Sequence, residues 1–162
     1  MTRIPPAIYS KPQIYLHWAI ALLVLFQLIF DMGMGRAFHQ MMEGTATGPG
    51  LAIVHIVVGV TVLVLMIARL GLRLTRGAPP LPQEEPGPLK ALAGIVHWVF
   101  YALLVLIPLS GLAAWFGQVA PAAGAHEVLT TLLWAVIALH VAGALYQQFV
   151  LKTGLLRRMS PH

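Results

Sequence analysis

Residues 126–140 read HEVLTTLLWAVIALH, an apolar run with a histidine at each end. At 100° per residue, the 14 steps from His126 to His140 fall about 40° short of four helical turns. Both rings therefore lie on nearly the same side of a helix. At 1.5 Å per residue they are about 21 Å apart along the helix axis, a spacing that suits two groups stacked across one bilayer.

The composition of the whole chain favours lipid as its solvent. Of the 162 residues 59% are apolar and 9% are charged, against about 25% charged in a typical soluble domain. Apolar segments of membrane-crossing length lie at about 14–32, 51–73, 91–116 and 126–151. Because backbone groups in lipid must be satisfied internally, these segments are expected as helices. We predict an all-α integral membrane four-helix bundle that forms one transmembrane domain over residues 1–162.

The connections between these segments are marked by glycine and proline. Residues 33–50 hold five glycines and Pro49. Residues 77–88 (GAPPLPQEEPGP) are predicted to be a non-helical loop, and residues 117–125 (GQVAPAAGA) a short polar break. The first apolar run is longer than the hydrophobic region of a typical signal peptide. We therefore expect it to remain as the first helix.

Basic residues predict the orientation of the bundle. With four crossings, every Lys and Arg except Arg36 falls on one side, which predicts by the positive-inside rule that both termini are cytoplasmic. The expected location is a bacterial inner membrane, crossed several times. The basic residues on the inner side are Arg3, Lys11, Arg69, Arg73, Arg76, Lys90, Lys152, Arg157 and Arg158.

The residue inventory narrows the chemistry. The chain has no cysteine, which excludes disulfides, iron–sulfur clusters and covalent haem attachment through Cys-x-x-Cys-His. The net charge is +5, and the basic residues flank the apolar segments. They therefore indicate topology signals and lipid headgroup contacts rather than nucleic-acid binding. A metal or cofactor must be held non-covalently, and the histidines are the main candidates to hold it.

The histidines fall at matched depths. On the outer side, His55 is the membrane-embedded candidate to pair with His126. On the inner side, His17 and His97 both lie at the depth of His140, and depth alone does not decide between them. A lone membrane histidine often only hydrogen-bonds a neighbouring helix, but ionisable groups in the bilayer are costly and usually functional. Zinc transport ranks low, since the apolar segments contain no embedded carboxylates.

Four stretches that together carry these five histidines also carry a family resemblance. In them the chain resembles the bacterial cytochrome b-561 family, particularly its small diheme members such as superoxide oxidase. The stretches are residues 15–18 (YLHW), 55–59 (HIVVG, leading into LMIARLGLR at 65–73), 97–108 (HWVFYALLVLIP) and 126–140.

The resemblance implies two non-covalent b-type haems, each held by two histidines, and electron exchange with ubiquinone. It implies that His17 and His140 bind the inner haem and that His55 and His126 bind the outer haem. His97 matches a further family histidine, which either contacts a propionate or a quinone or packs in the bundle.

Other residues are candidates for lesser roles around such cofactors. Glycines at 59, 111 and 143 would let a porphyrin approach the backbone or serve helix packing. Haem propionates are anionic and need cations nearby. The basic residues close to the histidines either serve this purpose or only anchor the topology. The basic candidates are Arg69, Arg73 and Lys11 inside, and Arg36 and His39 outside.

Two functional classes fit this reading. The first is a stand-alone oxidoreductase that passes electrons between a small outer donor, such as superoxide, and ubiquinone in the lipid. The second is an electron-conduit subunit that docks a redox protein partner such as a hydrogenase, dehydrogenase or cytochrome c. Short loops favour the first class, although Arg36 is accompanied outside by Asp31, Glu43 and Glu127, a weak collector of anions. A haem-free bundle is disfavoured by the histidine spacing.

The ligand pairs predict how much haem the protein holds. Because no cysteine can attach haem covalently, the haem should extract completely into acidified acetone. Quantification against polypeptide should give two haems per chain when the protein is expressed with adequate haem supply. A ratio of one or none would contradict the pairing of four histidines.

Overall fold

The computed structural model describes residues 9–30, 32–80 and 86–160, and every regular element in them is a helix. Four helices are long and apolar enough to cross a membrane, which confirms the predicted all-α fold. These are α1 (Lys11–Ile29), α3 (Ala52–Arg76), α4 (Gly87–Gly117) and α5 (Ala120–Phe149), accompanied by the short α2 (Met34–Met42) and the 3₁₀ helix η1 (Leu155–Met159).

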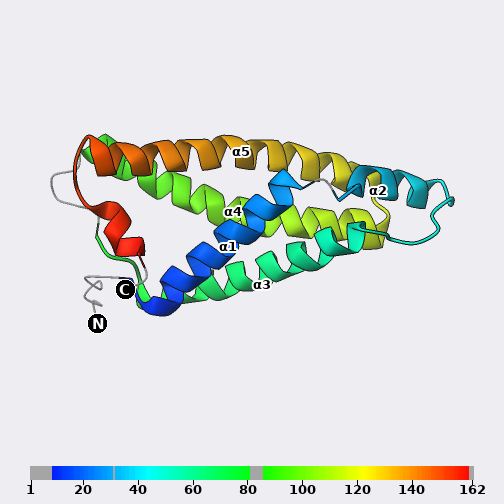
Figure 1. Cartoon of the computed structure of the whole chain (residues 1–162), viewed down its shortest axis with the longest axis horizontal. Coiled ribbons are helices and arrows are strands. Elements are labelled where there is room, and N and C mark those ends of the chain that lie inside the picture. The colour runs from blue at the N-terminus through cyan, green and yellow to red at the C-terminus, as the bar shows by residue number, and fades with distance from the viewer. Residues whose placement is uncertain (1–8, 31, 81–85, 161–162) are drawn as a thin grey trace.

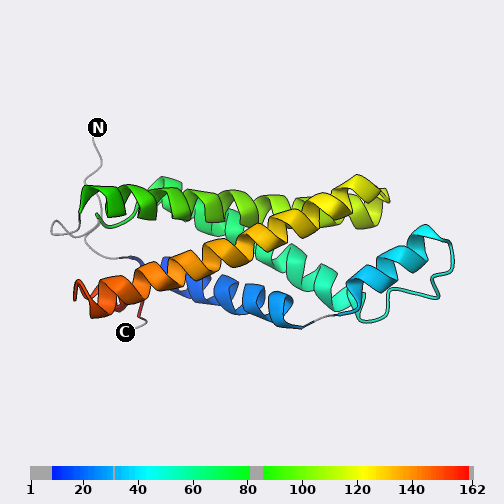
Figure 2. The same cartoon turned by 90° about the horizontal axis from the view of Figure 1, so that it is seen from above.

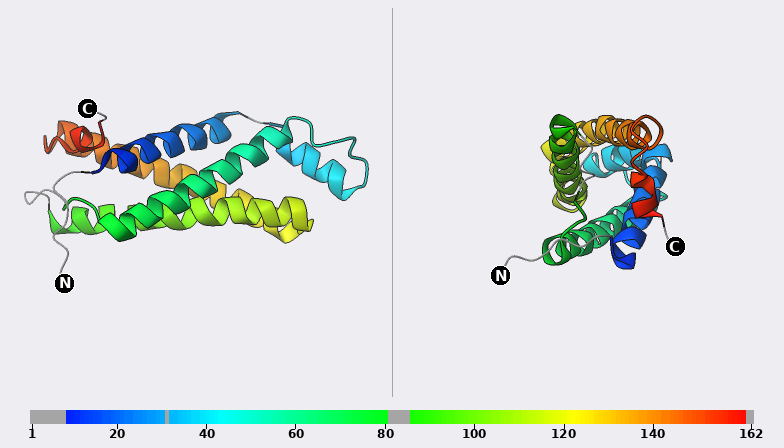
Figure 3. Two further views of the ribbon diagram at one scale, coloured as in Figure 1. Left: turned by 90° about the horizontal axis from the view of Figure 1, so that it is seen from below. Right: turned by 90° about the vertical axis from the view of Figure 1, so that its left-hand side faces the viewer.

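The four long helices form one elongated bundle (Figure 1). Seen from its end, they surround a common axis, with α5 beside α4, α4 beside α3 and α3 beside α1 (Figure 3). A thin core of apolar side chains lies between the helices and includes Val24, Met66, Leu104 and Leu133. Many larger apolar side chains, such as Leu22, point outward, as expected where lipid replaces water as the solvent.

The basic residues gather at one end of the bundle. The start of α1, the end of α3, the start of α4 and the end of α5 lie together there, and α2 lies at the opposite end (Figures 1 and 2). Within the described residues, Arg36 on α2 is the one Lys or Arg at the far end. This arrangement agrees with the predicted topology, and we call the two ends inner and outer accordingly; the cytoplasmic placement of the inner end stays a prediction.

Two predicted helix starts are several residues too late, and both lie at prolines. Helix α4 begins at Gly87 rather than 91, and α5 begins at Ala120 rather than 126. The 77–88 loop and the 117–125 break are both shorter than predicted. Pro88 and Pro121 lie in the first turns of these helices, where no intrahelical N–H bond is needed, so they start a helix instead of breaking it. Smaller shifts affect α1, predicted at 14–32, α3, predicted at 51–73, and the end of α5, predicted at 151.

Helix α2 was not predicted, because residues 33–50 were read as a connection. Gly33 precedes it with a φ of 65°, a left-handed conformation that glycine adopts without strain. The helix is strongly amphipathic. Met34 and Phe38 face a cavity, whereas His39 is exposed, with its Nε2 3.2 Å from Oε1 of Glu43. A short helix that packs at the outer end of a bundle needs an apolar stripe rather than a long apolar run.

A polar contact ties α1 to α3 at the inner end. Gln13 is only 4% exposed, and its Nε2 donates to the Gly77 carbonyl at 3.0 Å. Its Oε1 accepts from the Ser10 N–H and hydroxyl at 3.0 and 2.9 Å, which caps the first turn of α1. Arg69 of α3 donates from Nη1 to the Gln13 carbonyl at 2.6 Å. These bonds fix the start of one helix against the end of another.

We expect Gln13→Leu to destabilise the bundle by about 1–3 kcal/mol, because the Gly77 carbonyl and the Ser10 donors lose a partner in a buried position. Thermal unfolding in detergent should show a lower midpoint than the wild type. Gln40→Leu, which makes the same change on an exposed position of α2, is the matched control. Equal midpoints for the two variants would show that the contact does not stabilise the fold.

Candidate functional site

Two pairs of histidines meet inside the bundle, one toward each end. At the outer end, His55 of α3 and His126 of α5 have ring centres 6.0 Å apart, with planes inclined at 64°. At the inner end, His17 of α1 and His140 of α5 have ring centres 6.3 Å apart at the same inclination. Helix α5 therefore contributes one histidine to each pair, and α1 and α3 contribute the others.

These separations suit a shared metal ion. Two imidazoles that bind opposite sides of one metal, each at about 2.0–2.1 Å, have ring centres roughly 6 Å apart once half of each ring is added. His97 of α4 also lies near His140, but their ring centres are 5.4 Å apart and their planes are nearly perpendicular at 88°. All three pairs are inclined edge-to-face contacts, so the separation of the ring centres is what distinguishes them. The geometry favours His17 over His97 as the partner of His140, a choice that depth in the sequence left open.

His97 has a local partner of its own. Its Nδ1 lies 2.6 Å from the carbonyl of Ala93, one turn earlier in α4. Since a carbonyl can only accept, Nδ1 carries the proton and Nε2 keeps its lone pair. Arg69 and Arg73 are the charged groups near this histidine. The inner end thus combines the His17–His140 pair, a third histidine and two arginines.

The outer ligand candidate His126 is held by a neighbouring helix. Its Nδ1 donates to the Ile107 carbonyl of α4 at 2.8 Å. The Ser110 hydroxyl donates to the same carbonyl at 2.8 Å and lies 3.3 Å from Nδ1. With the proton fixed on Nδ1, the Nε2 of His126 presents its lone pair to a metal, which is the arrangement usual for metal-bound histidine.

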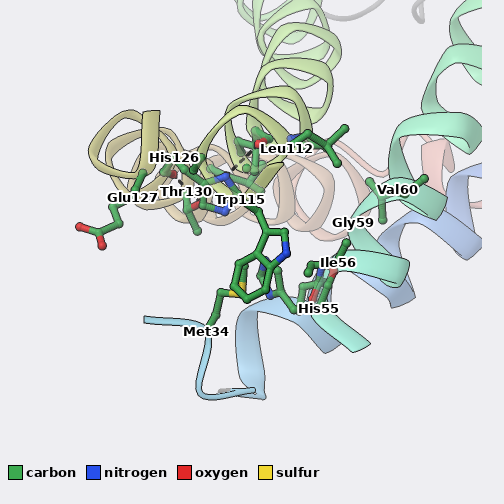
Figure 4. A pocket seen from close by; sticks show the side chains of 18 of the residues that line it. Met34, His55, Ile56, Gly59, Val60, Leu112, Trp115, His126, Glu127 and Thr130 are labelled. Carbon is green, nitrogen blue, oxygen red and sulfur yellow. Dashed lines mark hydrogen bonds between the residues drawn. The ribbon is translucent and has the colours of Figure 1, made fainter. Parts of the chain in front are cut away.

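A cavity of about 460 Å³ opens beside the outer pair. Its walls come from all five α-helices and are mostly apolar, with His55 and His126 among the few polar side chains. Figure 4 shows His55 and Trp115 within this pocket and the Glu127 carboxylate directed away from it. The volume lies in the range of about 300–1,000 Å³ that is usual for cofactor and ligand sites. Met34 and Phe38 of α2 close the outer side of the cavity, and sequence reasoning missed both.

Gln27 links the cavity wall to the backbone of His55. Its Nε2 donates to the His55 carbonyl at 3.0 Å, and its Oε1 is buried without a hydrogen-bond partner in the described part of the chain. The bond joins α1 to α3 at the depth of the outer pair. This glutamine was also not singled out from the sequence; a polar residue within an apolar membrane segment was the available signal.

The three candidate glycines differ in what they face. A Cβ at Gly111 would lie 3.1 Å from Cε1 of His126, whereas one at Gly59 would meet Nε2 of Gln27 at 3.4 Å. A Cβ at Gly143 would meet nothing within 4 Å. Gly111 is therefore the one of the three that lies directly against a candidate ligand ring.

The donor set fits haem better than a bare ion. Across residues 9–30, 32–80 and 86–160, no three or more His, Asp or Glu side chains are grouped to hold a metal. Pairs of histidines instead fit an iron whose other four ligands come from a porphyrin. Arg69 and Arg73 are partly buried at the inner end and suit anionic propionates; Lys11 and the outer Arg36 and His39 are exposed.

Comparisons with known proteins agree with this chemistry. Residues 8–162 match the family model described as prokaryotic cytochrome b561. Cytochrome b562 of Cereibacter sphaeroides is 38% identical, over 93% of this chain and 94% of that protein. A probable superoxide oxidase CybB of Yersinia pestis is 30% identical, over 94% and 96%, and cytochrome b561 homolog 1 of Escherichia coli K12 is 28% identical, over 94% and 97%. The chain therefore belongs to the prokaryotic cytochrome b561 family and is a haem-binding membrane cytochrome of electron transport.

Proposed function

We propose that this protein is a diheme b-type cytochrome that transfers electrons between a small outer-side donor and ubiquinone in the bacterial inner membrane. The observation that carries the proposal is the two histidine pairs, with ring centres 6.0 and 6.3 Å apart, at two depths of one bundle. His55 and His126 would hold the outer haem and His17 and His140 the inner one. Along α5 the two levels are about 21 Å apart.

The ligand set determines what kind of chemistry the site supports. When bound, each haem supplies a one-electron ferric–ferrous couple. Two histidines per iron leave no open position for oxygen, which favours electron transfer without bond formation at the metal. The chain holds the ligands on rigid helices that pack against each other. No helix has to move for electrons to travel between the two levels.

Superoxide is the donor we propose for the outer side. One relative is named a probable superoxide oxidase, and it aligns over nearly the whole of this chain. In the overall reaction, two superoxide anions each lose one electron and become dioxygen, and one quinone takes up two electrons and two protons to become quinol. The exposed Arg36 on α2 is the cation available to attract the anion at the outer end, although Glu43 and Glu127 are also exposed there.

The second candidate is an electron-conduit subunit that docks a hydrogenase, a dehydrogenase or cytochrome c. The relative at 38% identity is named cytochrome b562, a name that specifies no substrate. The short outer connections favour the stand-alone oxidoreductase. A conduit would reduce quinone only when its protein partner is present.

The inner end is the proposed place of quinone reduction. Quinone is apolar and enters from lipid, so its site should open sideways between helices. His97, with an Nε2 lone pair, and the nearby Arg69 and Arg73 offer polar contacts to a quinone there. The same residues are the candidates to neutralise propionates, and Lys11 lies at the same end.

Substitution of single histidines should separate the two haems. Each change removes one of the two histidines that would bind an iron, so the haem should be lost or keep only one histidine ligand. We expect His55→Ala and His126→Ala to affect the same haem, and His17→Ala and His140→Ala to affect the other. The measurement is the reduced-minus-oxidised spectrum together with haem per polypeptide. His97→Ala is the control and should keep both haems; if it loses the inner haem while His17→Ala keeps it, the inner assignment is wrong.

Reconstitution in liposomes tests the direction of transfer. A membrane-impermeant donor supplied at the outer end should reduce the outer haem and, through the inner one, quinone in the bilayer. We expect His17→Ala and His140→Ala to abolish quinone reduction while outer-haem reduction continues. Quinone reduction at the normal rate in these variants would place the quinone site at the outer haem instead.

A further inference from the structure

We propose that one turn of α4 is a positioning element for the outer haem ligand and sets the reduction potential of that haem. Three features of this turn act on His126: the Ile107 carbonyl, the Ser110 hydroxyl and the space left by Gly111. The inference rests on the proposed function, because it takes His126 as an iron ligand. It concerns residues that do not bind iron and act through His126.

The hydrogen bond from His126 to Ile107 joins two different helices. Nδ1 of His126 lies 2.8 Å from the carbonyl oxygen, within the usual range for an N–H···O hydrogen bond. In a helix that carbonyl also faces the N–H of residue 111, one turn later, so a second donor must approach from the side. The Ser110 hydroxyl, 2.8 Å from the carbonyl and 3.3 Å from Nδ1, lies at the same point.

Gly111 makes this approach possible. The carbonyl of a helical residue points toward the side chains three and four positions later, which here are a small serine and a glycine. A Cβ at position 111 would lie 3.1 Å from Cε1 and 3.2 Å from Nδ1 of His126. The ring therefore occupies the space that any other side chain at position 111 would need, and a ring bound to iron has little freedom to withdraw.

The support is specific to one of the four candidate ligands. In the part of the chain that the structure describes, the rings of His17, His55 and His140 make ring contacts but no hydrogen bond. An N–H donated from the far side of a ligand imidazole makes the bound nitrogen more electron-rich. That favours ferric over ferrous iron, and the effect is strong where the surroundings are apolar. The α4 turn should therefore lower the potential of the outer haem alone.

Gly111→Ala is the test, measured by redox titration of the purified holoprotein and by electron paramagnetic resonance of its ferric haems. The added methyl group should turn the His126 ring and lengthen its bond to Ile107. We expect an upward shift in the outer midpoint potential and a changed low-spin signal, with the inner haem unaffected. Loss of the outer haem alone would also support the proposal, since the inner haem reports that the bundle is folded.

Two glycines provide matched controls, because a Cβ at either meets nothing within 4 Å. Gly94→Ala lies on the same helix as Gly111, and Gly124→Ala lies two residues before His126 on α5. Both make the same gain in helix propensity, so both should leave the two potentials at wild-type values. An outer potential in Gly111→Ala that matches these controls would overturn the proposal.

Ser110→Ala supplies a measurement that adds no atom to the site. Removing the hydroxyl takes away one donor that competes with His126 for the Ile107 carbonyl. The bond from His126 should then strengthen, so the outer potential should fall, opposite in sign to Gly111→Ala. If the turn had a purely structural role, the two variants would not shift the outer potential in opposite directions. An unchanged or raised outer potential in Ser110→Ala would count against the proposal. His126→Ala separates the two levels of inference: if it keeps both haems, the ligand assignment fails, whereas if it loses the outer haem and Gly111→Ala is silent, only the positioning role fails.

Discussion

The need to satisfy backbone groups without water governs this structure. In lipid each N–H and C=O must bond within its own helix, which favours four long helices. Between them the polar side chains are mainly the histidines, two glutamines and Arg69. Helices in such a solvent gain little from hydrophobic association, so they depend on close packing and on a few interhelical hydrogen bonds. The positions of those bonds therefore largely determine where the bundle is rigid.

In this bundle the interhelical polar contacts lie near the histidine levels. Gln27 of α1 holds the backbone of His55 on α3, and Ile107 of α4 holds the ring of His126 on α5. Gln13 joins α1 to α3 at the inner end, where Arg69 donates to its carbonyl. Each contact crosses between two helices. Consequently, the bonds that hold the bundle together also fix the depth and orientation of the candidate ligands.

The sequence predicted the four spans and the depths of the histidines, because hydropathy and helical rise depend only on residues near in the chain. It did not predict α2, whose nine residues are amphipathic rather than apolar, or the early start of α5, because residues 117–125 were interpreted as a short polar break. The partner of His140 was open from depth alone, since choosing between His17 and His97 requires ring distances in three dimensions. Gly111 was recognised as a candidate, but the sequence could not show that it faces His126.

The outer ligand also shows why part of a site escapes sequence reasoning in a membrane protein. A soluble protein often orients a metal-bound histidine with a carboxylate, and a carboxylate leaves a visible mark in a sequence. Inside a bilayer a charged partner of that kind is costly, whereas a helix carbonyl is already present in every turn and needs only to be uncovered. Uncovering it takes a residue without a side chain, as at Gly111, next to a small one, as at Ser110. Gly111 thus supports His126 by leaving space for its ring. A sequence shows the glycine, but only the packing of α4 against α5 shows which ring occupies that space.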